Sequence, residues 1–210
     1  VVAPDFGSVA FVSRANPAYP LQVQPLAGGE PTTLASGLNE FGFLRWSPDS
    51  SRLAFVEFPF GGPRQVWLVR RDGQGLRNLG LGAAPAWSPD GSRLAFNGRA
   101  DEVFVVNADG DEQRQLGVGD DLHWSPDGSE LAFVTPDNTP APNALMVASA
   151  EGGAPTTLAQ GVGRLLGWTP DGAQLAYLSG GSDASLLLVG RGGGAPTRLA
   201  PSWFIDTLRW

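Results

Sequence analysis

A phrase of ten residues that recurs along the chain constrains the fold more than any other feature. It reads WSPDSSRLAF from Trp46, WSPDGSRLAF from Trp87, WSPDGSELAF from Trp124 and WTPDGAQLAY from Trp168. Trp210 ends the sequence after the residues TLR, and successive copies of this Trp are 37 to 44 residues apart. Self-similarity at a period of about 40 residues indicates stacked supersecondary units, and four-stranded propeller blades have this length.

Each copy carries the pattern of four short strands. The end of the phrase alternates polar and apolar residues, and a second alternating run follows, such as QVWLV or EVFVV. Gly-rich segments such as RRDGQG and NADGDE then suit a tight hairpin into a third strand that ends in Leu, and the fourth strand runs into the next Trp. The SPDG segment has the residue preferences of a type I turn. We therefore expect its Asp residues to bind turn amides; they are Asp49, Asp90, Asp127 and Asp171.

The two ends of the sequence complement each other. The first copy enters at Ser8 without the strand that leads into a Trp, and residues 205–210 (IDTLRW) have the sequence of that missing strand. We therefore predict an all-β fold: one β-propeller domain over residues 1–210, with five four-stranded blades closed by the C-terminal strand. Its repeats begin near Ser8, Trp46, Trp87, Trp124 and Trp168. Two alternatives are a fragment of a six-bladed propeller and an engineered propeller without a ligand.

The phrase WSPDGSRLAF, followed by an apolar strand and a Gly turn, resembles the TolB-like propeller repeat, a relative of the WD-type repeats. The resemblance covers the whole chain. It implies a bacterial protein of the periplasm, the cell envelope or the extracellular space that acts through contacts with other proteins. Related propellers also stand in front of hydrolase domains as gates. A fold of this kind serves many functions and does not by itself assign one.

Composition narrows the classes of partner and cofactor. The formal net charge is −7, and all 14 basic residues are Arg, so the sequence offers no basic stripe for nucleic acid. There is no Cys for a disulfide or a thiolate metal site. No apolar run approaches the ~20 residues of a membrane span. We expect no cofactor, no metal, no nucleic acid, no membrane insertion and a monomer.

The candidates for chemistry are few. His123 is the only histidine, and no G-x-S-x-G motif is present, so a hydrolytic triad is unsupported and we expect no enzymatic activity. His123 directly precedes a repeat Trp, as Arg45 and Arg209 do, and this position faces a neighbouring blade or the channel. With Asp120 and Asp121 these three residues are our channel candidates, although one imidazole and two adjacent carboxylates do not complete a metal site.

The connections between the two alternating runs of a copy, and between one copy and the next, vary in length and carry large apolar residues. In up-and-down order both kinds lie on one face, here called the variable-loop face, and such loops usually carry function. The segment EFPFGGPR is stiffened by Pro59 and Pro63. The predicted partner-binding residues are Tyr19, Phe41, Phe58, Phe60, Arg64 and Trp203. We therefore predict a protein-binding or scaffolding propeller; the alternative is a small-ligand-binding or hydrolase-gating propeller domain.

Overall fold

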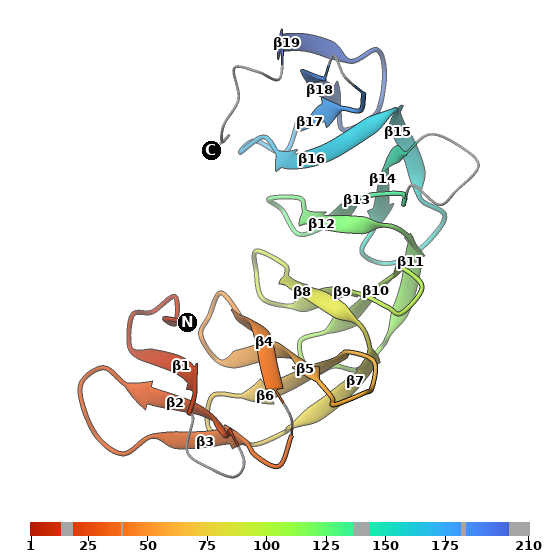
Figure 1. Ribbon diagram of the computed structural model, residues 1–210. Coiled ribbons are helices and arrows are strands. Elements are labelled where there is room, and N and C mark those ends of the chain that lie inside the picture. Colours follow the sequence, from red (N-terminus) through yellow and green to blue (C-terminus); the bar gives the residue numbers. More distant parts are fainter. Residues whose placement is uncertain (14–18, 39, 137–142, 182–183, 202–210) are drawn as a thin grey trace. The chain divides into compact units, whose positions relative to one another are not determined.

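The computed structural model describes residues 1–13, 19–38, 40–136, 143–181 and 184–201. Within these ranges the chain forms strands, turns and bends, with no helix, as Figure 1 shows. No helix in these ranges could therefore cross a membrane. The predicted all-β class is confirmed, and so is the arrangement of consecutive strands into small sheets. The predicted closing strand at residues 205–210, with Trp203 and Arg209, lies outside the described residues.

Strands that are consecutive in sequence are neighbours in one sheet. The first sheet has three strands: β1 (Ser8–Val12), β2 (Leu21–Pro25) and β3 (Thr32–Ala35). The second has β4 (Glu40–Trp46), β5 (Arg52–Phe58), β6 (Gln65–Arg70) and β7 (Arg77–Leu81), and the third has β8 (Ala83–Trp87), β9 (Arg93–Asn97), β10 (Glu102–Asn107) and β11 (Arg114–Val118). The fourth has β12 (Asp120–Trp124), β13 (Glu130–Val134), β14 (Ala144–Ser149) and β15 (Thr156–Gln160). The fifth has β16 (Val162–Trp168), β17 (Gln174–Ser179), β18 (Ser185–Gly190) and β19 (Thr197–Pro201).

The chain divides into two compact units, each described here by itself. The first comprises Val1–Ala100 with Phe104–Gln113, and the second Asp101–Val103 with Arg114–Trp210. Pairing in the second sheet is antiparallel throughout, from Arg52 opposite Arg70 to Glu57 opposite Gln65 between β5 and β6. The fourth and fifth sheets repeat this antiparallel pattern within the second unit.

The hydrophobic core lies between neighbouring sheets. The repeated residues Leu-Ala-Phe of the second strand explain why, because alternate side chains of a strand point to opposite faces. Leu53 and Phe55 join the cluster shared with the first sheet, whereas Ala54 joins the cluster shared with β9 and β10. All three are fully buried. A comparable cluster joins the fourth and fifth sheets in the second unit.

Within each unit, a repeat Trp ties one sheet to the sheet before it. Trp87 Nε1 donates a hydrogen bond to the carbonyl of Arg45 at 3.0 Å, and Trp168 Nε1 donates to the carbonyl of His123 at 3.1 Å. In both cases the acceptor residue directly precedes the Trp of the previous copy. The indole thus satisfies a backbone carbonyl at the sheet boundary, which accounts for Trp at this position.

The SPDG turn is built as its sequence predicts. Ser47 Oγ donates to Asp49 Oδ1 at 2.5 Å, and the amide of Ser51 donates to the same oxygen at 3.1 Å. The amide of Arg52 donates to Ser47 Oγ at 3.0 Å, which closes the turn onto β5. The corresponding Asp residues of the later turns, Asp90, Asp127 and Asp171, receive the same pair of hydrogen bonds. The role assigned to these four carboxylates, binding turn groups, is confirmed.

A further copy of the phrase opens the sequence, and sequence inspection overlooked it. Val2 pairs with Val9 of β1, and Trp46 Nε1 donates to the carbonyl of Val1 at 3.2 Å, as the later Trp residues do to the previous copy. Asp5 Oδ1 accepts from the amide of Gly7 at 2.8 Å, as Asp49 does from Ser51. Residues 1–8 (VVAPDFGS) therefore correspond to residues 45–52 (RWSPDSSR). The phrase is therefore present before Ser8, and residues 1–3 pair with β1. The closing role assigned to residues 205–210 stays a prediction.

Candidate binding surface

The loops at one end of the sheets have a uniform length, whereas those at the other end differ in length. Five residues join the first and second strands in each of the last four sheets, at 47–51, 88–92, 125–129 and 169–173. The second and third strands are joined instead by segments that range from four residues, 98–101, to nine, 135–143. The structure thus bears out the uniform turns and the variable connections between second and third strands of a sheet. The connections from one sheet to the next, which we expected to vary, are single residues at 82, 119 and 161.

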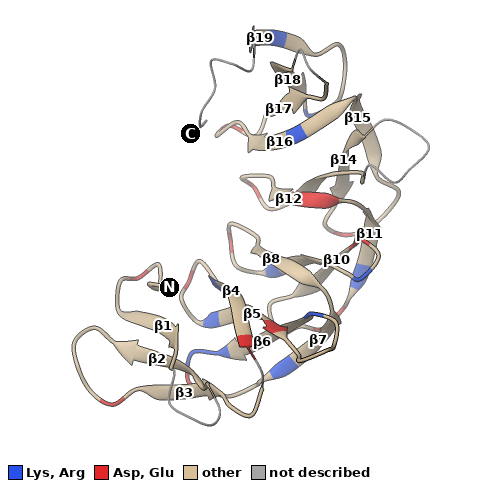
Figure 2. Ribbon diagram, in the orientation of Figure 1, with Lys and Arg blue, Asp and Glu red and all other residues tan. Residues whose placement is uncertain are grey.

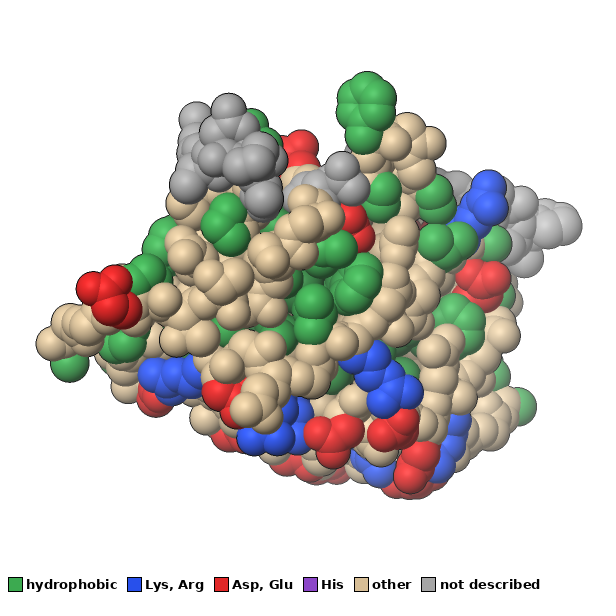
Figure 3. Space-filling model, turned by 90° about the horizontal axis from the view of Figure 1, so that it is seen from below, with side chains coloured by type: hydrophobic (Ala, Val, Ile, Leu, Met, Phe, Trp, Pro, Cys, Tyr) green, Lys and Arg blue, Asp and Glu red, His purple; other side chains and the backbone are tan. Residues whose placement is uncertain are grey.

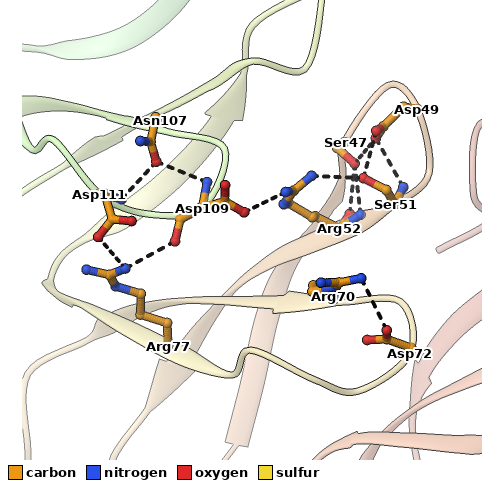
Figure 4. A network of polar contacts seen from close by, with 10 residues as sticks. All are labelled: Ser47, Asp49, Ser51, Arg52, Arg70, Asp72, Arg77, Asn107, Asp109 and Asp111. Atoms are coloured by element: carbon orange, nitrogen blue, oxygen red, sulfur yellow. Dashed lines mark hydrogen bonds and ion pairs between the residues drawn. The ribbon is translucent and has the colours of Figure 1, made fainter.

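The uniform turns of the first unit hold a network of ion pairs, drawn in Figure 4. Arg52 Nη2 contacts Asp109 Oδ1 at 2.6 Å, and Arg77 Nη1 contacts Asp111 Oδ1 at 2.6 Å. Both pairs join the second sheet to the β10–β11 turn. A groove of about 400 Å³ beside them is lined by these basic and acidic groups together. Charged side chains also gather along the lower edge of the view in Figure 3. Since each guanidinium already has a carboxylate, we interpret this network as structural.

The loop after β5 presents the most exposed large hydrophobic residue of the described chain. Phe60 is fully exposed, at 101% of its reference surface. The half-buried ring of Phe58 packs against the core cluster beneath the loop. Arg64 lies over that ring, with its guanidinium carbon 5.1 Å from the centroid. This cation–π contact orients the guanidinium without neutralising it. Phe60 and Arg64 are therefore exposed, as expected for contact residues, while Phe58 packs beneath Arg64.

A bulge in β4 accompanies the burial of one predicted partner residue and the exposure of a nearby phenylalanine. Phe41 is only 9% exposed and packs edge-on against Phe55, with centroids 5.3 Å apart, so we leave it out of the contact surface. Phe43 has φ +51° and is 46% exposed, and its ring lies 6.1 Å from that of Phe58. The register shifts here because a bulge turns the following residues to the other face. Sequence alternation alone does not reveal such a bulge.

Two other predicted partner residues stand apart from this loop. Tyr19 is 52% exposed in the connection between β1 and β2, which belong to a different sheet from the strands of this loop. Trp203 lies outside the described residues. The surface we carry forward, here called the Phe60 surface, consists of Phe43, Phe58, Phe60 and Arg64.

A small pocket adjoins the Phe60 surface. It has a volume of about 240 Å³ and is lined by residues 63–64, 81–83 and 98–99. Arg64 and Arg99 both line it, and both are exposed. Sequence inspection missed Arg99, although its place between the second and third strands of a copy would have put it on the variable-loop face.

The channel candidates are arranged as follows. Asp121 has φ +55° in a bulge of β12, the acidic strand in Figure 2. Its Oδ1 lies 3.3 Å from His123 Nε2, and its Oδ2 accepts from the amide of Leu165 at 3.0 Å. Burial alone would raise the pKa of Asp121, but the hydrogen bonds and charge around it outweigh that effect and hold the pKa below its usual value.

These contacts make Asp121 a tie between β12 and β16. Asp120 is exposed beside it. Among the described residues, no group of three or more potential metal ligands is present. Arg45 is exposed and donates to the carbonyl of Leu44 at 3.1 Å, and Arg209 lies outside the described residues. The assignment of Arg45 and Arg209 to a channel stays a prediction.

Solved structures with the same fold have varied functions. TolB from Acinetobacter baumannii is 22% identical, with a TM-score of 0.55, over 93% of this chain and 53% of that one. Oligogalacturonate lyase from Vibrio parahaemolyticus is 18% identical, with a TM-score of 0.64, over 95% of this chain and 64% of that one. A puromycin-hydrolyzing peptidase from Mycobacterium tuberculosis is 20% identical, with a TM-score of 0.63, over 96% of this chain and 37% of that one.

At these identities the likeness shows the fold alone, and the chain spans about half the length of the Acinetobacter TolB. Among curated proteins, none matches the chain in sequence. The family model of the TolB beta propeller domain matches residues 6–191. The match covers all four copies of the phrase that carried the resemblance, and it begins within the additional copy at the start. The chain therefore belongs to the TolB beta propeller domain family.

Proposed function

We propose that this chain is a non-enzymatic protein-binding module, and that the Phe60 surface is its contact site. The full exposure of Phe60 carries the proposal. Exposing a whole phenylalanine ring to water is unfavourable by about 2 kcal/mol relative to burial, and aromatic side chains are enriched as anchors at protein interfaces.

The loop that presents Phe60 is suited to binding because it is already ordered. Pro59 and Pro63 bracket the loop, and the amide of Gly62 donates to the carbonyl of Pro59 at 3.1 Å. A loop with few alternative conformations loses little entropy when a partner docks. Arg64 adds a guanidinium beside the apolar ring, and this combination of residues is common at interaction hot spots.

The test uses two exposed phenylalanines at opposite ends of the sheets. Phe60→Ser removes the proposed anchor, and Phe6→Ser is the matched control, since Phe6 is 79% exposed in the turn before β1. We expect a partner from a bacterial cell-envelope extract to be retained by the unmodified protein and by Phe6→Ser, and lost by Phe60→Ser. A photoreactive phenylalanine analogue at position 60 should crosslink the same partner. Retention of that partner by Phe60→Ser would refute the proposed surface.

The proposal includes an arrangement and a location. The sheets form five blades, and the protein acts as a monomer in the periplasm or elsewhere in the cell envelope; family membership supports this location. The alternatives are a piece of a six-bladed propeller and a small-ligand-binding or hydrolase-gating domain. The likeness in fold to the lyase and the peptidase favours the second of these. Turnover or binding of a small ligand that survives Phe60→Ser would support it.

A further inference from the structure

The pocket beside Phe60 combines two cations with no acidic group. Among its lining residues, Arg64 and Arg99 are the charged ones. In the described part of the chain, neither guanidinium has a carboxylate partner. Two other grooves of the first unit are also lined by arginine, but each contains acidic residues as well: Asp109 and Asp111 in one, Asp72 in the other.

Asp101 and Glu102, the acids nearest to Arg99 in sequence, are not among the residues that line the pocket. The pocket therefore has a local charge of +2 in a protein of net charge −7. Such a site attracts an anion, and repulsion between the negative chains disfavours a second copy as its occupant.

The backbone holds the two arginines in a rigid frame. The amide of Gly82 donates to the carbonyl of Arg64 at 2.9 Å. A Cβ at Gly82 would lie 2.2 Å from the carbonyl oxygen of Asn97, so the link between β7 and β8 passes directly against β9. The loop carrying Arg64 and the strand leading to Arg99 are thereby joined through Gly82. The contact of Arg64 with Phe58 fixes its guanidinium further.

The size of the pocket selects the kind of anion. Its volume of about 240 Å³ is below the ~300–1,000 Å³ of sites for drug-sized ligands and suits a single side chain. A carboxylate can accept two parallel hydrogen bonds from a guanidinium. Leu81, 38% exposed, lines the same pocket, and Phe60 belongs to the adjoining loop. An acidic residue with an apolar neighbour therefore matches both features of the surface.

We propose that this pocket binds the carboxylate of an Asp or Glu side chain in an extended segment of a partner protein, with an adjacent apolar residue of that segment on Phe60. This inference rests on the proposed function. It adds the chemistry of the partner, namely an acidic residue next to an aromatic or aliphatic one.

A displayed library of random peptides provides the probe. We expect selection on the unmodified protein to enrich Asp or Glu beside an apolar residue. For a selected peptide, Arg64→Gln and Arg99→Gln should each weaken the Kd about tenfold, which is the loss of one charge-assisted contact. Replacing the acidic residue of the peptide by its amide should weaken binding to the unmodified protein by a similar factor. The same replacement should weaken binding to the Arg99→Gln protein much less. Arg70→Gln is the control, because Arg70 is exposed at the end of β6 next to the β6–β7 turn, away from the loop that carries Phe60. Unchanged melting temperatures show that the variants are folded.

Three results would overturn the inference. The first is selection of peptides that need Phe60 for binding, contain no acidic residue and bind the arginine variants as well as the unmodified protein. This result would support the protein-binding function but exclude a role for the pocket. Inorganic phosphate that binds as tightly as the peptide and competes with it would indicate a site for free anions. Self-association that Arg64→Gln abolishes would assign the pocket to a second copy. If no peptide depends on Phe60 or on either arginine, the proposed function fails as well.

Discussion

The indole Nε1 of Trp168 lies 3.1 Å from the carbonyl oxygen of His123 and donates a hydrogen bond to it across the boundary between two sheets. The same bond recurs from Trp87 to Arg45 and from Trp46 to Val1. The carbonyl accepts this bond in each case, whatever side chain the acceptor residue carries. For this reason the residue before the Trp can vary from copy to copy while the Trp recurs.

Removing one such indole should destabilise the fold locally. Trp168 is 6% exposed and belongs to the core cluster of the second unit. Trp168→Phe removes the donor and part of the ring, and we expect the free energy of unfolding to fall by about 1–3 kcal/mol. Urea denaturation measures this. Phe60→Ser, which removes an exposed ring, should change the same quantity by less than about 0.5 kcal/mol. Equal losses in the two variants would contradict the assigned role of the Trp.

One turn position is occupied by glycine in three copies and by phenylalanine in the first. Gly91, Gly128 and Gly172 have φ between +67° and +71°, and Phe6 has φ +53° at the corresponding place. A bulky residue in this left-handed region costs about 1–2 kcal/mol. Since Phe6 is 79% exposed, Phe6→Gly should lose little packing and raise stability by about 1 kcal/mol.

The reciprocal variant tests the same cause. Gly91→Ala should lower the free energy of unfolding by about 1–2 kcal/mol. Ser50 is a useful comparison, because it has φ +60° but its Oγ accepts from the amide of Asp5 at 3.0 Å. Ser50→Gly should therefore give no gain. A stabilising effect of Ser50→Gly equal to that of Phe6→Gly would show that backbone conformation alone does not control this position.

Much of the fold was predictable because the repeat fixes hydrophobic alternation and turn chemistry together. The strand ending at Trp46, and the Asp49 turn after it, follow directly from the residues. The opening copy was missed because Val2 stands for Trp and Phe6 for the turn glycine, so that Pro4 and Asp5 are the main residues of the phrase it retains. The burial of Phe41 was not predictable, since the bulge in β4 depends on pairing with the next strand.

The candidate surface was predictable only in part, for a related reason. Loop residues such as Phe60 and Arg64 could be identified because they depart from the repeat. Arg99 could not be linked to Arg64 from sequence, because the two are brought together by the close passage of Gly82 beneath them. A juxtaposition of this kind depends on three separate segments.

Lowering the pH should destabilise the second unit, because Asp127 becomes protonated. The hydrogen bond from Ser125 Oγ, followed by those from the Ser129 amide and from Arg191, holds the pKa of Asp127 well below its usual range. The folded-state pKa is lower than the unfolded value near 3.9, so the stabilisation is present above about pH 4 and is lost as pH falls further. Asp127→Asn should be less stable than the unmodified protein at pH 7, and the difference should shrink at pH 3. Urea denaturation at both pH values checks this, and a constant difference would contradict the prediction.

Gly82 should tolerate no side chain. Its backbone conformation is open to other residues, but a Cβ would lie 2.2 Å from the carbonyl oxygen of Asn97 and 3.2 Å from Phe96. Because backbone atoms form this contact, Gly82→Ala must displace β8 from β9, and we expect a loss of about 3 kcal/mol. Gly192→Ala is the matched control, since nothing lies within 4 Å of its Cβ position. Thermal unfolding of the two variants should differ by several degrees. Equal melting temperatures would mean that the β7–β8 link can move away, and the frame that holds Arg64 beside Arg99 would then be looser than the structure indicates.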